Sequence, residues 1–327
     1  MLATYLPLAE RLERRDRLPD GETLAAITWI DLFAPTREEE LAVEALLGLD
    51  LPTREEMKEI EDSNRLYQQG GALFLTATVM VQSESEYPRA EEITFVVTGN
   101  RLVTVRYADP KAFQIFKTRA ERQPALCANG ERALLGLLEA VLQRVADAVE
   151  RASADLDDLV HAVLDPDAGP QGKPKPRDHA ALLRRLERNQ VLVARARLSL
   201  MSMNRLLGFL LRPTLEFPIG KAFRSQVQTL VHDTHSLIDF TAFLATNISF
   251  ELDAILGMVN IEQNGIIKIF SVAAVVFLPP TLVASIYGMN FEHIPELKWL
   301  FGYPWALIVM IASAIVPYWF FKRRGWL

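Results

Sequence analysis

The chain has 327 residues, half of which are hydrophobic, and its formal net charge is −6. This length suits about two domains, and a mean hydropathy only slightly above zero fits a large water-exposed part joined to a small membrane part. Nucleic-acid binding has little support, because the one basic block is Lys322-Arg323-Arg324. The single cysteine, Cys127, rules out a disulfide within the chain and argues against a cysteine-built zinc site.

The first predicted part, residues 1–125, has the pattern of an α/β domain. Apolar runs rich in β-branched residues predict strands, and Thr98-Gly99-Asn100-Arg101 predicts a hairpin turn between two of them. Threonines followed by acidic residues predict helix starts at Thr36 and Thr53. The predicted strands are Ala26–Phe33, Ala72–Val81, Ile93–Val97 and Leu102–Arg106, and the predicted helices are Thr36–Leu47 and Thr53–Asp62. We find no phosphate-binding glycine loop and no nucleophile elbow here, so the sequence does not predict an enzyme.

Residues 126–218 predict a long antiparallel helical hairpin. Apolar residues recur at helical spacing from about 129 to 165, and a second helix is expected from about 178 to 211 after a loop rich in proline and glycine. The end of the first helix is acidic, whereas the second helix is rich in arginine. We favour solvated charged faces for both; the alternative is an acidic tip that collects divalent cations.

Residues 219–265 predict the cytoplasmic part of a stalk helix. No helix breaker interrupts the chain between Lys221 and Pro279, so the stalk is expected to continue into the apolar segment that follows. About 65 helical residues at 1.5 Å each would form a rod of roughly 100 Å. Asp253 lies near the membrane end of this rod. A lone aspartate there is usually just solvated, but in a ring of several copies it becomes a cation site.

Residues 266–327 predict two transmembrane helices, because Ile269–Tyr287 and Tyr303–Phe321 hold no charged residue. About 20 apolar residues span a bilayer of ~30 Å, and two such runs would be unusual in the core of a soluble domain. The basic block follows the second run, whereas the loop between the runs is largely acidic. The positive-inside rule therefore places both termini in the cytoplasm and the loop outside, in an inner membrane or, alternatively, a plain plasma membrane.

A polar sequence, Tyr287-Gly288-Met289-Asn290, closes the first run and suggests a mouth for ions. Two helices cannot enclose a water-filled path, so conduction requires several copies around an axis. Steps of three and four residues back from the mouth define one helical stripe of polar, small and bulky apolar residues. This stripe consists of Asn264, Ile267, Phe270, Ala274, Leu278, Thr281 and Ser285. It either lines a pore with hydrophobic constrictions or serves ordinary helix packing, and spacing alone does not decide between them. Pro279-Pro280 should kink or loosen the helix.

Four segments of the C-terminal part together resemble the CorA magnesium transporters, most closely their proteobacterial branch. They run from Asn264 to Phe270, from Phe277 to Phe291, from Pro295 to Trp299 and from Phe301 to Pro304. The basic ending from Phe321 to Leu327 also resembles the tail of that family. The resemblance is specific from about Ile261 onward and looser over the rest.

The resemblance implies an α+β membrane protein that forms a homopentameric funnel and takes up Mg²⁺, and also Co²⁺ and Ni²⁺. It implies that Asn290 accepts a hydrated ion while Gly288 and Met289 shape the turn. It further implies an inner polar ring at Asn264, an acidic ring at Asp253 and a hydrophobic gate near the bulky residues of the stripe. Mg²⁺ would be both the transported and the regulatory ion, because members of the family close when intracellular Mg²⁺ bridges subunits through acidic residues.

The chemistry of the predicted mouth suits Mg²⁺, which loses its water reluctantly. A ring of neutral Asn290 oxygens would hold the hydrated ion without trapping it, and Glu292 and Glu296 would raise the cation concentration outside. The sequence departs from many relatives at His293, which either binds a transition metal or, as is more common for an exposed histidine, is inert. The alternatives are a Zn²⁺ transporter that resembles ZntB and, in another class, a membrane-anchored sensor that does not conduct.

Overall fold

The computed structural model describes residues 1–8, 11–18, 26–164, 178–217, 220–290 and 294–325. Contacts between these residues divide the chain into two compact units, Met1–Leu252 and Asp253–Leu327. One helix, α8 (Lys221–Tyr287), contributes residues to both units. The expectation of a stalk that continues into the first apolar run without a break is therefore confirmed at the level of secondary structure.

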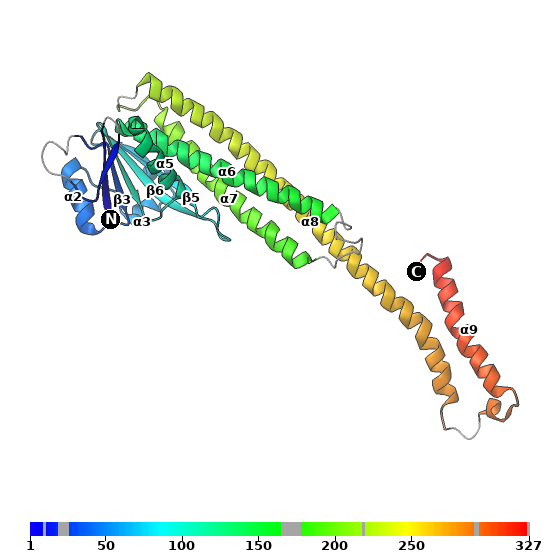
Figure 1. The fold of residues 1–327 in the computed structure, drawn as a ribbon. Coiled ribbons are helices and arrows are strands. Elements are labelled where there is room, and N and C mark those ends of the chain that lie inside the picture. Colours follow the sequence, from blue (N-terminus) through cyan, green and yellow to red (C-terminus); the bar gives the residue numbers. More distant parts are fainter. Residues whose placement is uncertain (9–10, 19–25, 165–177, 218–219, 291–293, 326–327) are drawn as a thin grey trace. The chain divides into compact units, whose positions relative to one another are not determined.

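The first unit is built on one sheet of seven strands in the order β2-β1-β3-β7-β6-β5-β4 (Figure 1). Neighbouring strands are antiparallel except β3 and β7, which are parallel. The strands are β1 (Leu2–Pro7), β2 (Leu12–Arg15), β3 (Trp29–Phe33), β4 (Leu66–Gln69), β5 (Ala72–Val81), β6 (Arg89–Thr98) and β7 (Arg101–Arg106). The predicted hairpin is confirmed, because Thr98 pairs with Arg101 and Gly99 takes a positive φ of 53° in the turn between them.

Helices cover both faces of this sheet, which explains why every residue of β5 is buried, Thr76 and Thr78 included. On one face, Val43 of α2 (Arg37–Leu47) and Met57 of α3 (Arg54–Met57) join the aliphatic core. On the other face, Trp29 packs against the rings of Phe113 and Phe116 from α5 (Lys111–Arg122). The long helices α6 (Gly130–Leu164) and α7 (His179–Leu210) also contact strands of the sheet.

Both threonine N-caps predicted for this unit are present as capping boxes. The Thr36 hydroxyl accepts from the backbone N–H of Glu39, and the Glu39 carboxylate accepts from the backbone N–H of Thr36. Thr53 and Glu56 do the same at the start of α3. The prediction of one helix from Thr53 to Asp62 is wrong, because α3 ends at Met57 and a separate short helix, α4 (Asp62–Arg65), leads into β4. The strand predicted from Ala26 begins only at Trp29.

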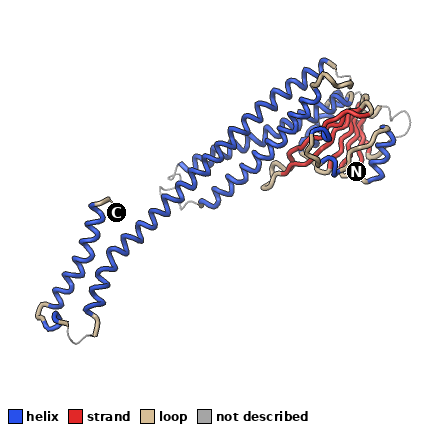
Figure 2. Tube along the Cα trace, turned by 180° about the vertical axis from the view of Figure 1, so that it is seen from behind, coloured by secondary structure: helices blue, strands red, loops and turns tan. Residues whose placement is uncertain are grey.

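The helices α6 and α7 lie side by side, as Figures 1 and 2 show, and form the predicted hairpin. Opposite charges meet across it, because Asp155 accepts hydrogen bonds from Arg185 and from Asn189, the latter at 2.7 Å. Burial would raise the pKa of the Asp155 carboxyl, but these bonds and the charge of Arg185 lower it below its ordinary value. Asp155 is thus engaged inside the hairpin rather than free to collect cations, and Asp165 and Asp167 lie outside the described residues.

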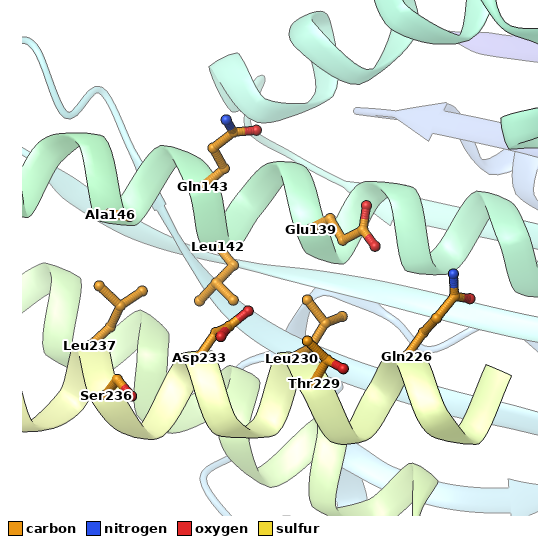
Figure 3. Close-up of a pocket in the computed structure, with 10 residues that line it drawn as sticks. All are labelled: Glu139, Leu142, Gln143, Ala146, Gln226, Thr229, Leu230, Asp233, Ser236 and Leu237. Atoms are coloured by element: carbon orange, nitrogen blue, oxygen red, sulfur yellow. The ribbon is translucent and has the colours of Figure 1, made fainter. Parts of the chain in front are cut away.

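A groove of about 580 Å³ separates α6 from the first half of α8 (Figure 3). Leu142 of α6 and Leu230 and Leu237 of α8 line its apolar part, and Glu139 and Asp233 add two carboxylates. Within the described parts of the chain, no group of three or more histidine, cysteine, aspartate or glutamate side chains is placed to hold a metal ion. The groove therefore offers no cation site of that kind.

Two serines of α7 bind the edge of β5 where the short strand β4 no longer covers it. β4 pairs only with Ala72–Leu75. Further along β5, the hydroxyl of Ser202 accepts from the backbone N–H of Thr78 at 2.8 Å, and that of Ser199 accepts from Met80 at 3.2 Å. Unpaired N–H groups on a strand edge are costly when buried, so these serines replace a neighbouring strand.

We expect Ser199→Ala to lower the free energy of unfolding by about 1–3 kcal/mol, because the buried N–H of Met80 loses its acceptor. Denaturant unfolding of the full chain in detergent measures this change. Ser236→Ala is the matched control, since that exposed hydroxyl donates only to the His232 carbonyl of its own helix; its effect should stay within about 0.5 kcal/mol. Equal stability of both variants would show that the serine contact does not hold the edge.

The second unit contains the end of α8, the short 3₁₀ helix η2 (Pro295–Lys298) and α9 (Gly302–Arg323). By length and composition, α8 and α9 are both able to cross a membrane, and almost none of the apolar stretch of each is buried in the single chain. In a soluble core such stretches would be buried. The two predicted spans are therefore present as helices whose apolar surface needs a cover that the chain itself does not supply.

Candidate functional site

The mouth sequence lies where α8 ends. Tyr287 is its last helical residue, and the backbone N–H groups of Gly288 and Met289 still bond to the carbonyls of Ala284 and Ile286. A Cβ atom at position 288 would lie 3.0 Å from the Ala284 carbonyl oxygen, tighter than most real contacts. Glycine at position 288 thus permits the close backbone contact with the last turn at which the helix ends.

Asn290 follows this turn and is exposed. Among the described residues, its side-chain amide has no hydrogen-bond partner, so its oxygen is available to a ligand. The carbonyl end of α8 carries the negative pole of the helix dipole, which favours a cation at this position. Glu296 lies in η2 and is half-buried, whereas Glu292 and His293 lie outside the described residues.

A residue that sequence reasoning did not single out, Gly302, fixes the far end of the loop. It is buried and begins α9, and a Cβ atom there would lie 2.1 Å from the Glu296 carbonyl oxygen. Only a residue without a side chain permits this approach of η2 to α9. The glycine between Phe301 and Tyr303 at the start of an apolar run was the available signal.

The predicted stripe on α8 is exposed along its whole length in the single chain. The exposed fraction is 61% for Ile267, 70% for Phe270 and 66% for Leu278. The remaining members, Asn264, Ala274, Thr281 and Ser285, are exposed as well. Residues Val272, Val276 and Val283 are half-buried, and at 3.6 residues per turn they fall on the opposite side of the helix. The stripe thus lies within the part of the helix surface that contacts within the chain leave free, a part that also includes Ile269, Phe277 and Leu282.

The helix is not interrupted at Pro279 and Pro280, which both lie inside α8. The two missing N–H groups leave backbone carbonyls one turn earlier without their usual donors. The hydroxyl of Thr281 donates to the carbonyl of Phe277 in this region. Thr281 therefore has a bond within its own helix, and its oxygen keeps acceptor capacity for another partner.

Asp253 is exposed on α8 and has no ion-pair partner among the residues that the structure describes. Two carboxylates of the first unit, by contrast, are already paired with cationic side chains. The Glu84 carboxylate accepts from Lys111 at 2.8 Å and from Arg144 at 2.6 Å, and these bonds lower its pKa to about 2. Asp31 is buried against Arg106 and Lys117. Asp253 is thus more open to a cation than Glu84, Asp31 or Asp155, each of which is paired with a cationic side chain.

Comparison with known proteins gives the chain its family. A family model described as CorA-like Mg²⁺ transporter protein matches residues 25–323. The magnesium transport protein CorA of Escherichia coli K12 is 36% identical over 327 residues, which cover all of both chains. The chain belongs to the CorA-like Mg²⁺ transporter family. CorA of Salmonella typhimurium LT2 shows the same identity and coverage, so the resemblance drawn from the C-terminal segments extends over the whole chain.

Solved structures show that the fold is also that of CorA. The complete CorA magnesium transporter of Methanocaldococcus jannaschii matches with a TM-score of 0.75 at 18% identity, over 100% of this chain and 99% of that one. The cytoplasmic domain of ZntB from Vibrio parahaemolyticus matches more weakly, with a TM-score of 0.54 at 10% identity over 79% of this chain and 97% of that one. The comparisons therefore do not favour the ZntB alternative over CorA.

Proposed function

We propose that this protein is a channel-like transporter that takes up Mg²⁺, and also Co²⁺ and Ni²⁺, and that it is not an enzyme. The observation that carries the proposal is the exposed stripe of α8, which leads up to the free amide of Asn290 in a chain of the CorA family. A polar mouth at the end of such a stripe has no use in a membrane anchor that does not conduct, which argues against the sensor alternative.

The proposed active form is a homopentamer with the stripe of each copy facing a common axis. Each chain supplies two membrane-spanning helices, which are too few to enclose a path. In such a ring, Ile267, Phe270 and Leu278 would form dry constrictions that gate by dewetting, and Asn264 and Thr281 would offer oxygens between them. The half-buried side of α8 would remain for contacts within the subunit.

At the proposed mouth, five Asn290 amides would bind the hydrated ion through neutral oxygens. Mg²⁺ gives up its water reluctantly, so a site that contacts the water shell selects the ion without stripping it. Glu292 and Glu296, repeated in each subunit, would concentrate cations outside the ring. Inward flow would need no ATP, because a divalent cation gains about 4.6 kcal/mol for every 100 mV of membrane potential.

The proposed location is the inner membrane, with both termini in the cytoplasm and the loop between the spans outside. The basic residues at the end of α9 support this orientation. In this arrangement Asp253 lies on the cytoplasmic side, where intracellular Mg²⁺ reaches it. We propose that Mg²⁺ bound there closes the channel, as a second, regulatory role of the same ion.

We expect Asp253→Ala to raise the internal Mg²⁺ concentration needed for half-inhibition by at least about fivefold, the usual lower size of a coupling between sites. Mg²⁺ uptake by vesicles that are loaded with a series of internal Mg²⁺ concentrations measures this change. Asp239→Ala is the matched control, an exposed aspartate on the same helix. Unchanged inhibition in Asp253→Ala would remove this residue from the gate but leave transport itself intact.

Competitive uptake into reconstituted vesicles tests the choice of ion. With Mg²⁺ as the reporter, Co²⁺ and Ni²⁺ are expected to compete, and Zn²⁺ to be carried poorly. Zn²⁺ uptake that exceeds Mg²⁺ uptake under the same conditions would support the ZntB-type alternative instead. Binding of a partner protein with no flux of any of these ions would support the sensor.

A further inference from the structure

Three consecutive cations at the end of α9 each lie over an aromatic ring one turn earlier. The Lys322 ammonium is 5.8 Å from the ring centre of Tyr318, the Arg323 guanidinium 5.2 Å from that of Trp319, and the Arg324 guanidinium 4.9 Å from that of Phe320. We call these six residues the aromatic–basic collar. Side chains four residues apart meet on one helix face, which makes each of these pairs possible.

The three cationic side chains of the collar are spread around the helix, and their rings restrict their motion. Successive helix positions are about 100° apart, so the three cations fan out over more than half of the helix circumference. A cation over a ring face is worth about 0.5–1 kcal/mol at an exposed site, which reduces the motion of each long side chain. All three cations are exposed, and none of them has an ion pair with a carboxylate among the described residues.

The position of the collar sets the kind of partner it fits. It ends a helix that is long and apolar enough to cross a membrane. Tyrosine and tryptophan rings favour the level of the lipid headgroups, so the cations stacked on them would lie at the level of the lipid phosphates. Guanidinium groups match phosphate oxygens in a fork of two hydrogen bonds. The cations lack carboxylate partners in the described chain, so they are available to an anionic partner.

We propose that the aromatic–basic collar binds anionic phosphodiester lipids of the surrounding bilayer in preference to zwitterionic ones. This inference rests on the proposed insertion of α9 into a membrane. It goes beyond ion transport, because it assigns a lipid class to residues that take no part in the mouth, the stripe or the gate. The zwitterionic phosphatidylcholine carries the same phosphate, but its own choline cation opposes the collar.

Lipid retention by the full-length protein tests the proposal. The protein is purified in detergent, incubated with an equal mixture of phosphatidylglycerol and phosphatidylcholine, separated from free lipid and analysed by mass spectrometry. A cation near an anionic surface contributes about fivefold to binding. We therefore expect the variant K322Q/R323Q/R324Q to lose the preference for phosphatidylglycerol by at least about tenfold, and Trp319→Leu to weaken it by about two- to fivefold while keeping the charge.

Two controls make the result specific. Lys298→Gln removes a cation near the start of α9 and should leave the lipid ratio unchanged, and Lys322→Arg should preserve it. High salt should reduce the preference of the unaltered protein, which requires no variant to fold. The proposal is overturned if the triple variant, or the unaltered protein at high salt, keeps the full preference. Lipid ratios are measured without ion flux, so this outcome is independent of whether the protein transports Mg²⁺.

Discussion

Replacing Asn290 with alanine is expected to abolish Mg²⁺ flux while leaving the protein folded and assembled. The side chain is exposed beyond the end of α8 and supports no contact within the described chain, so its loss should not disturb the fold. If each of five subunits loses one hydrogen bond of about 1 kcal/mol to the hydrated ion, the combined loss is on the order of a thousandfold. Flux into vesicles loaded with a fluorescent Mg²⁺ indicator measures it.

Asn247→Ala is the matched control for this variant. It makes the same chemical change at a half-buried position of α8 on the side of the helix opposite the predicted stripe, and flux should remain close to that of the unaltered protein. Flux through Asn290→Ala at the level of Asn247→Ala would show that Asn290 does not hold the ion. The proposal for the mouth would then be wrong even if the protein transports Mg²⁺.

Removing the carboxylate of Asp31 is expected to cost about 3–5 kcal/mol of unfolding free energy, the usual effect of leaving one buried charge alone. Asp31 accepts two hydrogen bonds from Arg106, at 2.9 and 3.0 Å, and one from Thr104 at 2.9 Å. Lys117 adds a further charge at 2.9 Å. Asp31→Ala would remove the acceptor of Nε and Nη2 of Arg106, whose guanidinium is buried against the rings of Phe33 and Phe113 and would keep only the Nη1 bonds to Asp109 and the Ala108 carbonyl.

The same network predicts how stability depends on pH. Burial alone would raise the pKa of the Asp31 carboxyl, but the Arg106 hydrogen bonds and the charges of Arg106 and Lys117 outweigh burial and lower it. A lowered pKa in the folded state stabilises the protein above the unfolded-state pKa, and this contribution is lost as pH falls through the folded-state value. Asp31→Ala should therefore lose less stability than the unaltered protein on acidification.

A double-mutant cycle with Arg106→Met measures the interaction free energy between Asp31 and Arg106 apart from their contacts with other residues. Removing both partners should destabilise less than the sum of the two single changes, because neither Asp31 nor Arg106 is then left buried without the other. Asp16→Ala, which breaks the exposed pair with Arg14, should change stability by less than about 1 kcal/mol. Additive effects of Asp31→Ala and Arg106→Met would mean that the two side chains do not stabilise the fold as a pair.

Local signals in the sequence predicted local structure well. The threonine caps, the Gly99 hairpin and the long helices all depend on neighbours in the chain, and each was found. The helix α5 was missed although Phe113, Phe116 and Ala120 recur at helical spacing, so its signal was present. The strands β2 and β4 were missed because they are short and form the polar edges of the sheet. The strand β1 was missed although it is as long as β7.

Features that depend on contacts between residues far apart in the chain could not be predicted from the sequence. The partnership of Asp31 with Arg106 follows from the parallel register of β3 and β7, which sets Phe33 beside Arg106. The use of Ser199 and Ser202 to cover the β5 edge requires knowing that β4 is too short. At the candidate site, the mouth and the stripe were predicted from spacing and family resemblance. The structure adds that every member of the stripe is exposed within the single chain, as are neighbouring residues of the span such as Phe277 and Leu282.

The voltage dependence of Mg²⁺ entry into sealed vesicles that contain the purified protein tests the proposed transport most directly. A potassium gradient and valinomycin set the potential, and a fluorescent indicator inside the vesicles reports Mg²⁺. We expect inward flux without ATP that rises as the interior becomes more negative and is absent in vesicles with Asn290→Ala. Protein that is inserted and assembled, yet passes no Mg²⁺ at any interior-negative potential, would contradict it.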